Sequence, residues 1–222
     1  MSFFHTLQQR TEKDRLGLVT TPLVQAAVLG RVGRGQYLAF LAEAYHHVKH
    51  TVPLLMACGA RLPERLEWLR EAVGEYINEE LGHQEWILND IRAAAGDPQS
   101  VRQGNPSLAT DVMVAYAYDT VLRRNPVGFF GMVHVLEGTS VALADSAARA
   151  IADKLNLPAK AFSYLTSHGS LDQEHVAFFE KLMNRITESQ DQEAIVSTAQ
   201  VMYRLYGDIF RTLPQEEASH AA

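Results

Sequence analysis

Apolar residues recur along most of the chain at steps of three and four, the spacing that places side chains on one face of an α-helix. Hairpin signals and alternating runs of β-branched residues are absent from the sequence. Gly, Pro and capping residues indicate where the helices begin and end. Two helices are opened by proline, one at Thr21-Pro22 and one at Pro158. The others are predicted over about 3–15, 36–58, 63–96, 108–124, 127–155 and 193–212, with a polar loop over 97–107. The sequence therefore predicts an all-α bundle of about seven helices, a single domain covering residues 1–222.

The helix opened by Pro158 carries three ionisable residues on its apolar face. His168, Asp172 and His175 are spaced i, i+4 and i+7, and the same face continues apolar with Leu165 before them and Phe179 after them. Burying such groups without partners would cost several kcal/mol each. A metal ion is the simplest common partner for two imidazoles and a carboxylate. The alternative interpretation is a row of ion pairs on the helix surface.

Two more ionisable residues occupy the apolar stripe of the helix predicted over 63–96. Glu80 and His83 have the Glu-x-x-His spacing of helical di-iron proteins, which aims both side chains at one point between helices. The adjacent Glu79 continues an i+4 row from Glu71 that we expect to face solvent. The phase of the stripe thus favours Glu80 over Glu79, although a local π-bulge would exchange them.

The helix predicted over 127–155 places one carboxylate, Glu137, in its buried stripe. The candidate metal ligands from the three helices are Glu80, His83, Glu137, His168, Asp172 and His175. Three carboxylates and three imidazoles suit two divalent ions of the iron or manganese type, and the lack of thiolates argues against structural zinc or an iron–sulfur cluster. Each residue taken alone has the alternative interpretation of a hydrogen-bonded core group.

Side chains beside these residues are candidates for a substrate pocket and for further ligands. The pocket candidates are Tyr76, Phe130, Val133, His134 and Tyr164. The flanking apolar residues Phe129, Phe130, Met132 and Leu136 favour a small, partly apolar organic substrate. Further candidate ligands are His46, His47 and His50, beside Glu43, for which hydrogen bonding or solvent exposure is the alternative.

Composition limits the partners of the protein. The net charge is −6 and Lys and Arg are not clustered, which argues against a nucleic-acid surface. The single cysteine, Cys58, excludes an intrachain disulfide and fits a reducing cytoplasm; we expect it to be a small buried residue and not a nucleophile. No window of ~20 uninterrupted apolar residues occurs, so no membrane span is expected.

Several segments resemble known families. TTPLVQAAVLGRVGRGQYLAFLAEAYHHV resembles the opening of the TENA/THI-4 and PqqC-like proteins, which have the haem-oxygenase-like all-α fold. NEELGHQEW, the isolated Glu137 and HGSLDQEH resemble the haem-oxygenase-like di-iron oxidases, a group that includes an alkene-forming fatty-acid decarboxylase and CADD-type proteins.

This resemblance implies an oxidoreductase that holds two iron ions, or an iron–manganese pair, and takes dioxygen as co-substrate. Carried over by position, it assigns the metal ligands to the six residues named above, with Glu79 as the other candidate for the first of them. It also implies a homodimer.

The sequence departs from related activities of the same fold. TENA-type thiaminases use a cysteine in a middle helix, and no cysteine follows Cys58. Haem oxygenases use an N-terminal proximal histidine, for which His5 is poorly placed, and a Gly-rich distal helix, which is missing. PqqC-type enzymes use no metal. The alternatives to a di-iron oxidase are a metal-independent TENA/PqqC-like protein that binds a pyrimidine or quinone-like ligand, and a non-catalytic metal-binding homodimer.

Overall fold

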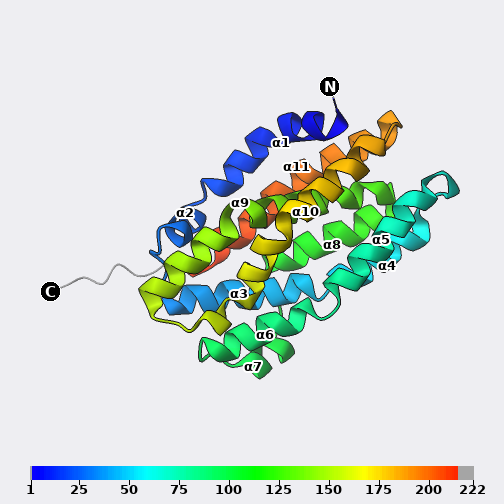
Figure 1. Ribbon diagram of the computed structural model, residues 1–222. Helices are drawn as coiled ribbons and strands as arrows, with labels where there is room; N and C mark the ends of the chain where they lie inside the picture. The colour runs from blue at the N-terminus through cyan, green and yellow to red at the C-terminus, as the bar shows by residue number, and fades with distance from the viewer. Residues whose placement is uncertain (1, 215–222) are drawn as a thin grey trace.

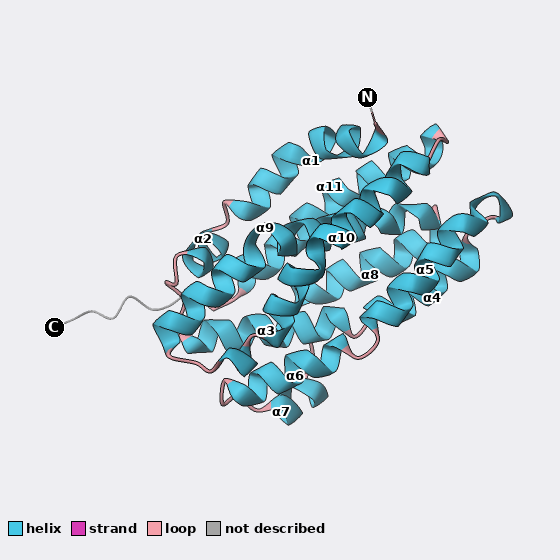
Figure 2. Ribbon diagram, in the orientation of Figure 1, coloured by secondary structure: helices cyan, strands magenta, loops and turns pink. Residues whose placement is uncertain are grey.

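The computed structural model describes residues 2–214, and describes side chains in this range outside residues 167–175. Over that part of the chain it contains helices and turns but no strand (Figure 2). The α-helices are α1 (Phe3–Val19), α2 (Pro22–Val28), α3 (Arg34–Val48), α4 (Thr51–Arg61), α5 (Glu67–Glu80), α6 (His83–Ala93), α7 (Pro98–Gln103), α8 (Leu108–Arg123), α9 (Phe129–Leu155), α10 (Ser163–Arg185) and α11 (Ser189–Thr212). Short 3₁₀ helices are η1 (Glu64–Leu66), η2 (Pro126–Gly128) and η3 (Ala159–Ala161). The predicted all-α class is confirmed, but the described residues form eleven α-helices where about seven were expected.

A proline divides the helix that was predicted over 36–58. α3 ends at Val48, and α4 begins at Thr51, which makes Pro53 the third residue of α4. Proline has no N–H and clashes with the carbonyl four residues earlier, so it is tolerated in the first turn of a helix and disfavoured inside one. The predicted end near residue 58 was also wrong, because α4 continues to Arg61.

A glycine divides the helix that was predicted over 63–96. Leu81 is extended, and Gly82 has φ of 91°, a left-handed conformation that favours glycine. Glu80 therefore ends α5 and His83 begins α6. The prediction that these two residues share one helix was wrong.

The segment expected to be a polar loop, 97–107, contains the short helix α7. The Asp97 side chain accepts hydrogen bonds from the backbone N–H groups of Gln99 and Ser100 and so caps α7. The prediction of an uninterrupted loop over 97–107 was therefore wrong.

The core consists of two clusters of buried apolar side chains that are joined by α9. The first half of α9 contributes Phe129 and Val133 to one cluster, and its second half contributes Ala147 and Ile151 to the other. In Figure 1, α9 lies among α2, α10 and α11. The passage of α9 through both clusters supports the prediction of one domain, which stays a prediction.

Residues Pro126–Leu155, which include α9, are long and apolar enough by length and composition to cross a membrane. Half of the most apolar window of this segment is buried inside the protein. A core helix that is apolar on most sides has the same composition. We interpret α9 as such a core helix, and the absence of membrane contact stays a prediction.

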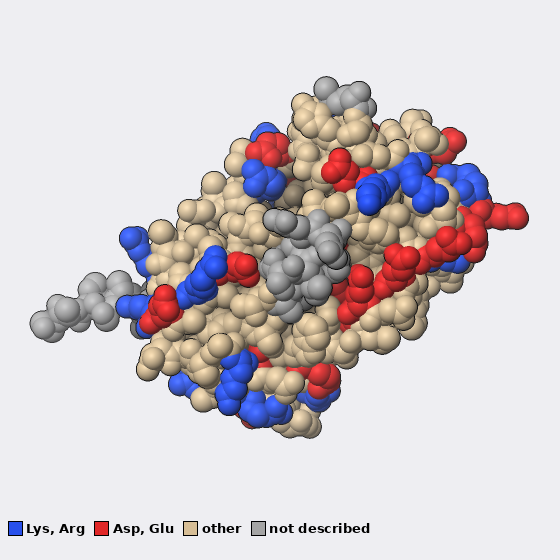
Figure 3. All heavy atoms as spheres, viewed as in Figure 1, with Lys and Arg blue, Asp and Glu red and all other residues tan. Residues whose placement is uncertain are grey.

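Acidic side chains form a row on the exposed face of α5 (Figure 3). Glu71, Glu75 and Glu79 are spaced four residues apart and are all exposed. The expectation that this row faces solvent is confirmed.

Candidate metal centre and its cavity

A cavity of about 170 Å³ lies between the two apolar clusters. Its wall is built from α2, α3, α4, α5, α9, α10 and α11, and most of the residues on it are apolar. The polar residues on the wall are Gln36, Tyr37, His47, Thr51, Tyr76, Glu80, Glu137, Thr139, Ser140, Tyr164 and Tyr206. Among the side chains that the structure describes, no Lys or Arg contributes to this wall. The cavity is therefore apolar, with acidic but not basic charge.

Two of the predicted carboxylates line this cavity from different helices. Glu80 comes from the last turn of α5 and Glu137 from the middle of α9, and both are partly buried. Burial raises the pKa of Tyr76 well above its usual range, and the charge of Glu137 raises it further, followed by smaller effects of Glu79 and Glu80. Both wall carboxylates therefore act on one phenol. Glu79 is exposed and does not line the cavity, so the geometry favours Glu80 as the wall carboxylate.

His83 contacts Glu80 across the helix break. Its Nδ1 lies 2.9 Å from Oε2 of Glu80, and its side chain is 7% exposed against 18% for Glu80. The ring also packs against Trp86, with 4.2 Å between the ring centroids. His83 is not on the cavity wall. In this structure it fixes the orientation of the Glu80 carboxylate.

The remaining predicted ligands lie on α10. The backbone of α10 is helical over Ser163–Arg185, which includes positions 168, 172 and 175. The side chains of His168, Asp172 and His175 lie outside the described residues. Before them, Tyr164 lines the cavity, and after them Phe178 contacts the ring of Tyr76 with 5.7 Å between centroids.

The described residues alone do not form a group of three or more His, Cys, Asp or Glu side chains able to hold a metal ion. Three of the six predicted ligands are outside that set. Glu80, His83 and Glu137 are thus the predicted ligands whose side chains can be placed. The other three predicted ligands belong to α10.

Of the five predicted substrate-pocket residues, Tyr76, Val133 and Tyr164 line the cavity. Phe130 does not line it and is fully buried in an apolar cluster, while its neighbour Phe129 is on the wall. The sequence prediction for Phe130 was wrong because its side chain lies about 100° around the helix from Phe129 and is packed inside the apolar cluster.

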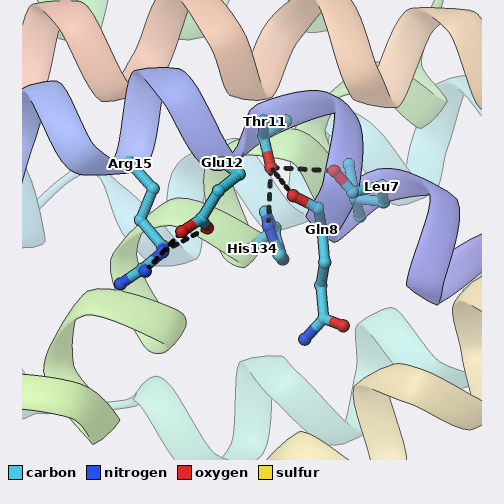
Figure 4. A network of polar contacts seen from close by, with 6 residues as sticks. All are labelled: Leu7, Gln8, Thr11, Glu12, Arg15 and His134. Atoms are coloured by element: carbon cyan, nitrogen blue, oxygen red, sulfur yellow. Dashed lines mark hydrogen bonds and ion pairs between the residues drawn. The ribbon is translucent and has the colours of Figure 1, made fainter.

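His134 also lies away from the cavity, which corrects its prediction as a pocket residue. Its Nε2 is 3.5 Å from Oγ1 of Thr11 on α1 (Figure 4). Its ring stacks on Phe179 and meets Tyr203 edge to face. Burial lowers the pKa of His134 to about 4, so the imidazole is neutral at pH 7. His134 is a packing residue between α1, α9 and α11.

The three histidines near the end of α3 are separated by the structure. His46 Nδ1 lies 3.2 Å from Nζ of Lys49, and His50 Nδ1 lies 3.2 Å from the Tyr118 hydroxyl. Only His47 lines the cavity, where its ring meets that of Tyr206 edge to face.

The hydrogen bonds of Glu43 are made with the start of α8, although its charge also acts on His46. Its carboxylate accepts hydrogen bonds from the backbone N–H and the hydroxyl of Ser107 and from the hydroxyl of Thr110. It therefore stabilises the start of α8.

Two wall residues had no signal in the sequence that separated them from ordinary core residues. Tyr206 and Phe210 lie on α11, with their rings 5.0 Å apart, and both face the cavity. Their spacing of four residues predicts only a buried helix face. Which buried face borders a cavity is decided by the neighbouring helices.

Two residues that related activities would use, Cys58 and His5, lie away from the cavity wall. Cys58 is buried and donates a hydrogen bond from Sγ to the carbonyl of Pro126, and burial raises its pKa to about 12. His5, the histidine in α1, is exposed. The face that α2 turns to the cavity is apolar, with Leu23, Val24 and Ala27 among its residues. Neither a thiol nucleophile nor an N-terminal histidine ligand for haem is therefore placed at the described part of the wall.

Comparison with known proteins identifies the fold and the family. Residues 38–207 match the model of a protein family described as iron-containing redox enzyme, of the haem-oxygenase-like group. A search of curated proteins finds no match.

Solved structures agree closely in fold. A domain of unknown function with a heme oxygenase-like fold from Shewanella denitrificans superposes with a TM-score of 0.83 at 21% identity, over 95% of this chain and 91% of that one. A TenA homologue from Pseudomonas syringae pv. tomato gives 0.78 at 11% identity, over 94% and 91%. Heme oxygenase from Leptospira interrogans gives 0.75 at 17% identity, over 96% and 100%. The haem-oxygenase-like fold expected from the sequence is confirmed, and at these identities the likeness concerns the fold alone.

Proposed function

This chain belongs to the haem-oxygenase-like family of iron-containing redox enzymes, and on that premise we propose that it is a non-haem di-iron, or iron–manganese, oxidase or oxygenase that oxidises a small, partly apolar organic molecule. The observation that carries the proposal is the presence of Glu80 and Glu137, from two helices, on the wall of one apolar cavity. Carboxylates that project from separate helices towards one point are the arrangement by which helical di-iron proteins hold their metals.

The donor set fits iron. Carboxylate and imidazole donors without thiolates are the ligands of non-haem iron and manganese. The residues that would hold the two ions are Glu80, His83, Glu137, His168, Asp172 and His175. When bound, the metals would supply the redox chemistry that activates dioxygen, which the side chains of the protein cannot supply.

The protein itself contributes orientation and a dry pocket. His83 holds the Glu80 carboxylate through the 2.9 Å hydrogen bond, so that the carboxylate keeps one orientation. Apolar residues of α9, among them Phe129, Met132 and Leu136, exclude water from the cavity beside the carboxylates. Binding of an apolar substrate there would be favourable, because the apolar surface of the substrate would leave water.

Metal binding and dioxygen consumption test the proposal. The purified chain, loaded anaerobically with ferrous iron, is expected to bind about two ions, measured by mass spectrometry, and to consume dioxygen when air is admitted. Glu137→Gln and His168→Ala are expected to lower the iron content, whereas Glu75→Gln and His5→Ala, which change exposed residues of the same types, are not. Equal iron content in all four variants would show that the ligand assignment is wrong.

Two other functions predict different results. A metal-independent TENA/PqqC-like protein would be stabilised against heating by a pyrimidine or quinone-like ligand in the presence of a chelator. A non-catalytic metal-binding homodimer would bind iron fully and consume no dioxygen with any substrate offered. We favour the oxidase because the two carboxylates that would hold metal lie on an otherwise apolar wall, where an apolar substrate can bind beside them.

The surroundings of the protein are proposed from the sequence. We propose a homodimer in the cytoplasm that acts on a small molecule and contacts neither nucleic acid nor membrane. Light scattering in solution tests the dimer.

A further inference from the structure

Among the polar groups of the cavity wall, the hydroxyl of Tyr76 has an unusual environment. The residue is 3% exposed, and its Oη is buried without a hydrogen-bond partner among the described residues. Buried hydroxyls are nearly always hydrogen-bonded, because leaving one unpaired destabilises the folded state. The exceptions call for a specific explanation, such as a ligand that completes the bond.

Other unpaired hydroxyls are less informative. Thr139 also lines the cavity with a buried, unpaired Oγ1, but a helical threonine can rotate and donate to a carbonyl of its own helix. Thr120 has an unpaired Oγ1 but is not on the cavity wall. The hydroxyl of Tyr76 cannot form a hydrogen bond by such a rotation, because packing holds its ring in place. Its ring belongs to the same apolar cluster as Phe129 and Val133 and contacts Phe178.

The charge around this hydroxyl decides which role it can play. A tyrosine hydroxyl keeps its proton at neutral pH and so can donate a hydrogen bond. Glu80 and Glu137 are close enough to act electrostatically on Tyr76, but neither accepts a hydrogen bond from it. The hydroxyl is therefore a donor that the protein leaves available at the carboxylate side of the cavity.

The remainder of the wall specifies the rest of the ligand. The cavity volume of about 170 Å³ exceeds the roughly 150 Å³ of an engineered apolar cavity that binds benzene. Away from the carboxylates, the wall continues apolar through Leu143, Ala147 and Ile151 of α9 towards α2. A molecule of benzene size or somewhat larger, with one polar atom, matches this distribution.

We infer that Tyr76 is the specificity residue of this cavity, and that it donates a hydrogen bond to an acceptor oxygen carried on the apolar body of the substrate. This inference names the substrate class of the site proposed above and rests on that proposal. It also predicts that Tyr76 distinguishes an oxygen from a methylene group at one position of the ligand.

A pair of isosteric probes tests the inference. Acetophenone and α-methylstyrene have nearly the same shape and differ by an oxygen in place of a CH₂ group. Calorimetric titration of the full chain as purified, kept free of dioxygen so that nothing is oxidised, gives both affinities, and the ratio of acetophenone to α-methylstyrene affinity expresses the preference for oxygen. In Tyr76→Phe this ratio should fall by about three- to tenfold, because α-methylstyrene binding is unchanged and acetophenone binding weakens.

Tyr203→Phe is the matched control. Tyr203 is buried on α11 and packs against His134, away from the cavity wall. Tyr203→Phe should therefore keep the full preference for acetophenone. Because α-methylstyrene must still bind to Tyr76→Phe, a misfolded variant is recognised at once.

Three results would overturn the inference: the same preference in Tyr76→Phe as in the parent, loss of the preference in Tyr203→Phe as well, or no binding of either probe to the parent. Iron content measured on the same samples keeps the two proposals apart. Protein that binds two irons but shows the same ratio in Tyr76→Phe as in the parent contradicts only the role of Tyr76. Protein whose ratio falls in Tyr76→Phe but that binds no iron contradicts the oxidase.

Discussion

Nδ1 of His83 lies 2.9 Å from Oε2 of Glu80, although the two residues belong to different helices. The break at Leu81 and Gly82 lets α6 start in a new direction while its first residue stays in contact with the last residue of α5. On one continuous helix, residues three apart are neighbours on the same face, and the helix itself sets their relative position. Here the left-handed Gly82 between the two helices sets the relative position of Glu80 and His83 instead.

The position of Glu80 on the wall predicts a contrast between two adjacent residues. Glu80→Gln should weaken ferrous iron binding by about tenfold or more, since it removes a charged donor from the cavity. Glu79→Gln should leave binding unchanged, because Glu79 is exposed and off the wall. Anaerobic iron titration of both variants checks this, and a larger loss in Glu79→Gln would reverse the assignment.

Gly82 and Gly74 predict opposite effects of the same substitution. Gly82→Ala should lower the free energy of unfolding by about 1 kcal/mol, because alanine is strained at φ of 91°. Gly74→Ala should raise it by about 0.5 kcal/mol or more, because Gly74 lies inside α5 with open space at its Cβ position. Urea unfolding measures both changes. Gly82→Ala should also weaken iron binding, whereas Gly74→Ala should not.

His134 predicts a pH dependence of stability. Its pKa is about 4 in the folded protein and about 6.5 when unfolded, so the unfolded state takes up the proton first as the pH falls. The stabilising contribution of the neutral ring is complete above pH 6.5 and is lost progressively down to pH 4. Between pH 7.5 and 5 the parent should lose about 2 kcal/mol more stability than His134→Phe, in which this group cannot titrate. Parallel urea curves at both pH values for parent and variant test this, and an equal loss in both would contradict it.

Burial of Cys58 predicts an unreactive thiol. With a pKa of about 12, its thiolate fraction at pH 8 is about a thousandfold below that of a free cysteine. Iodoacetamide should therefore label the native chain only at the rate of its unfolding, and label it rapidly in urea. A Glu75→Cys variant, with its cysteine on the exposed face of α5, should be labelled quickly in the native state. Rapid native labelling of the parent would contradict the burial of Cys58.

The sequence by itself determined the helical class and several helix starts. Pro22 begins α2 as predicted, and the segment at Asn125-Pro126 separates α8 from α9. These features depend on local chemistry, namely the period of apolar residues and the fixed φ of proline. Local chemistry also marked Glu80 and Glu137 as charges within apolar stripes, and both are on the cavity wall.

Only the tertiary structure decided which side of each buried helix borders the cavity. Phe129 and Val133 face it, whereas Phe130 and His134, equally buried and one residue further along the helix, face a packed core. The periodicity cannot separate these two sets, because α9 is covered on most sides and both sets are apolar or neutral. The difference arises from the helices that meet α9, with α1 and α11 against His134 and the cavity against Phe129. Such packing joins residues far apart in the chain, and a local pattern carries no information about it.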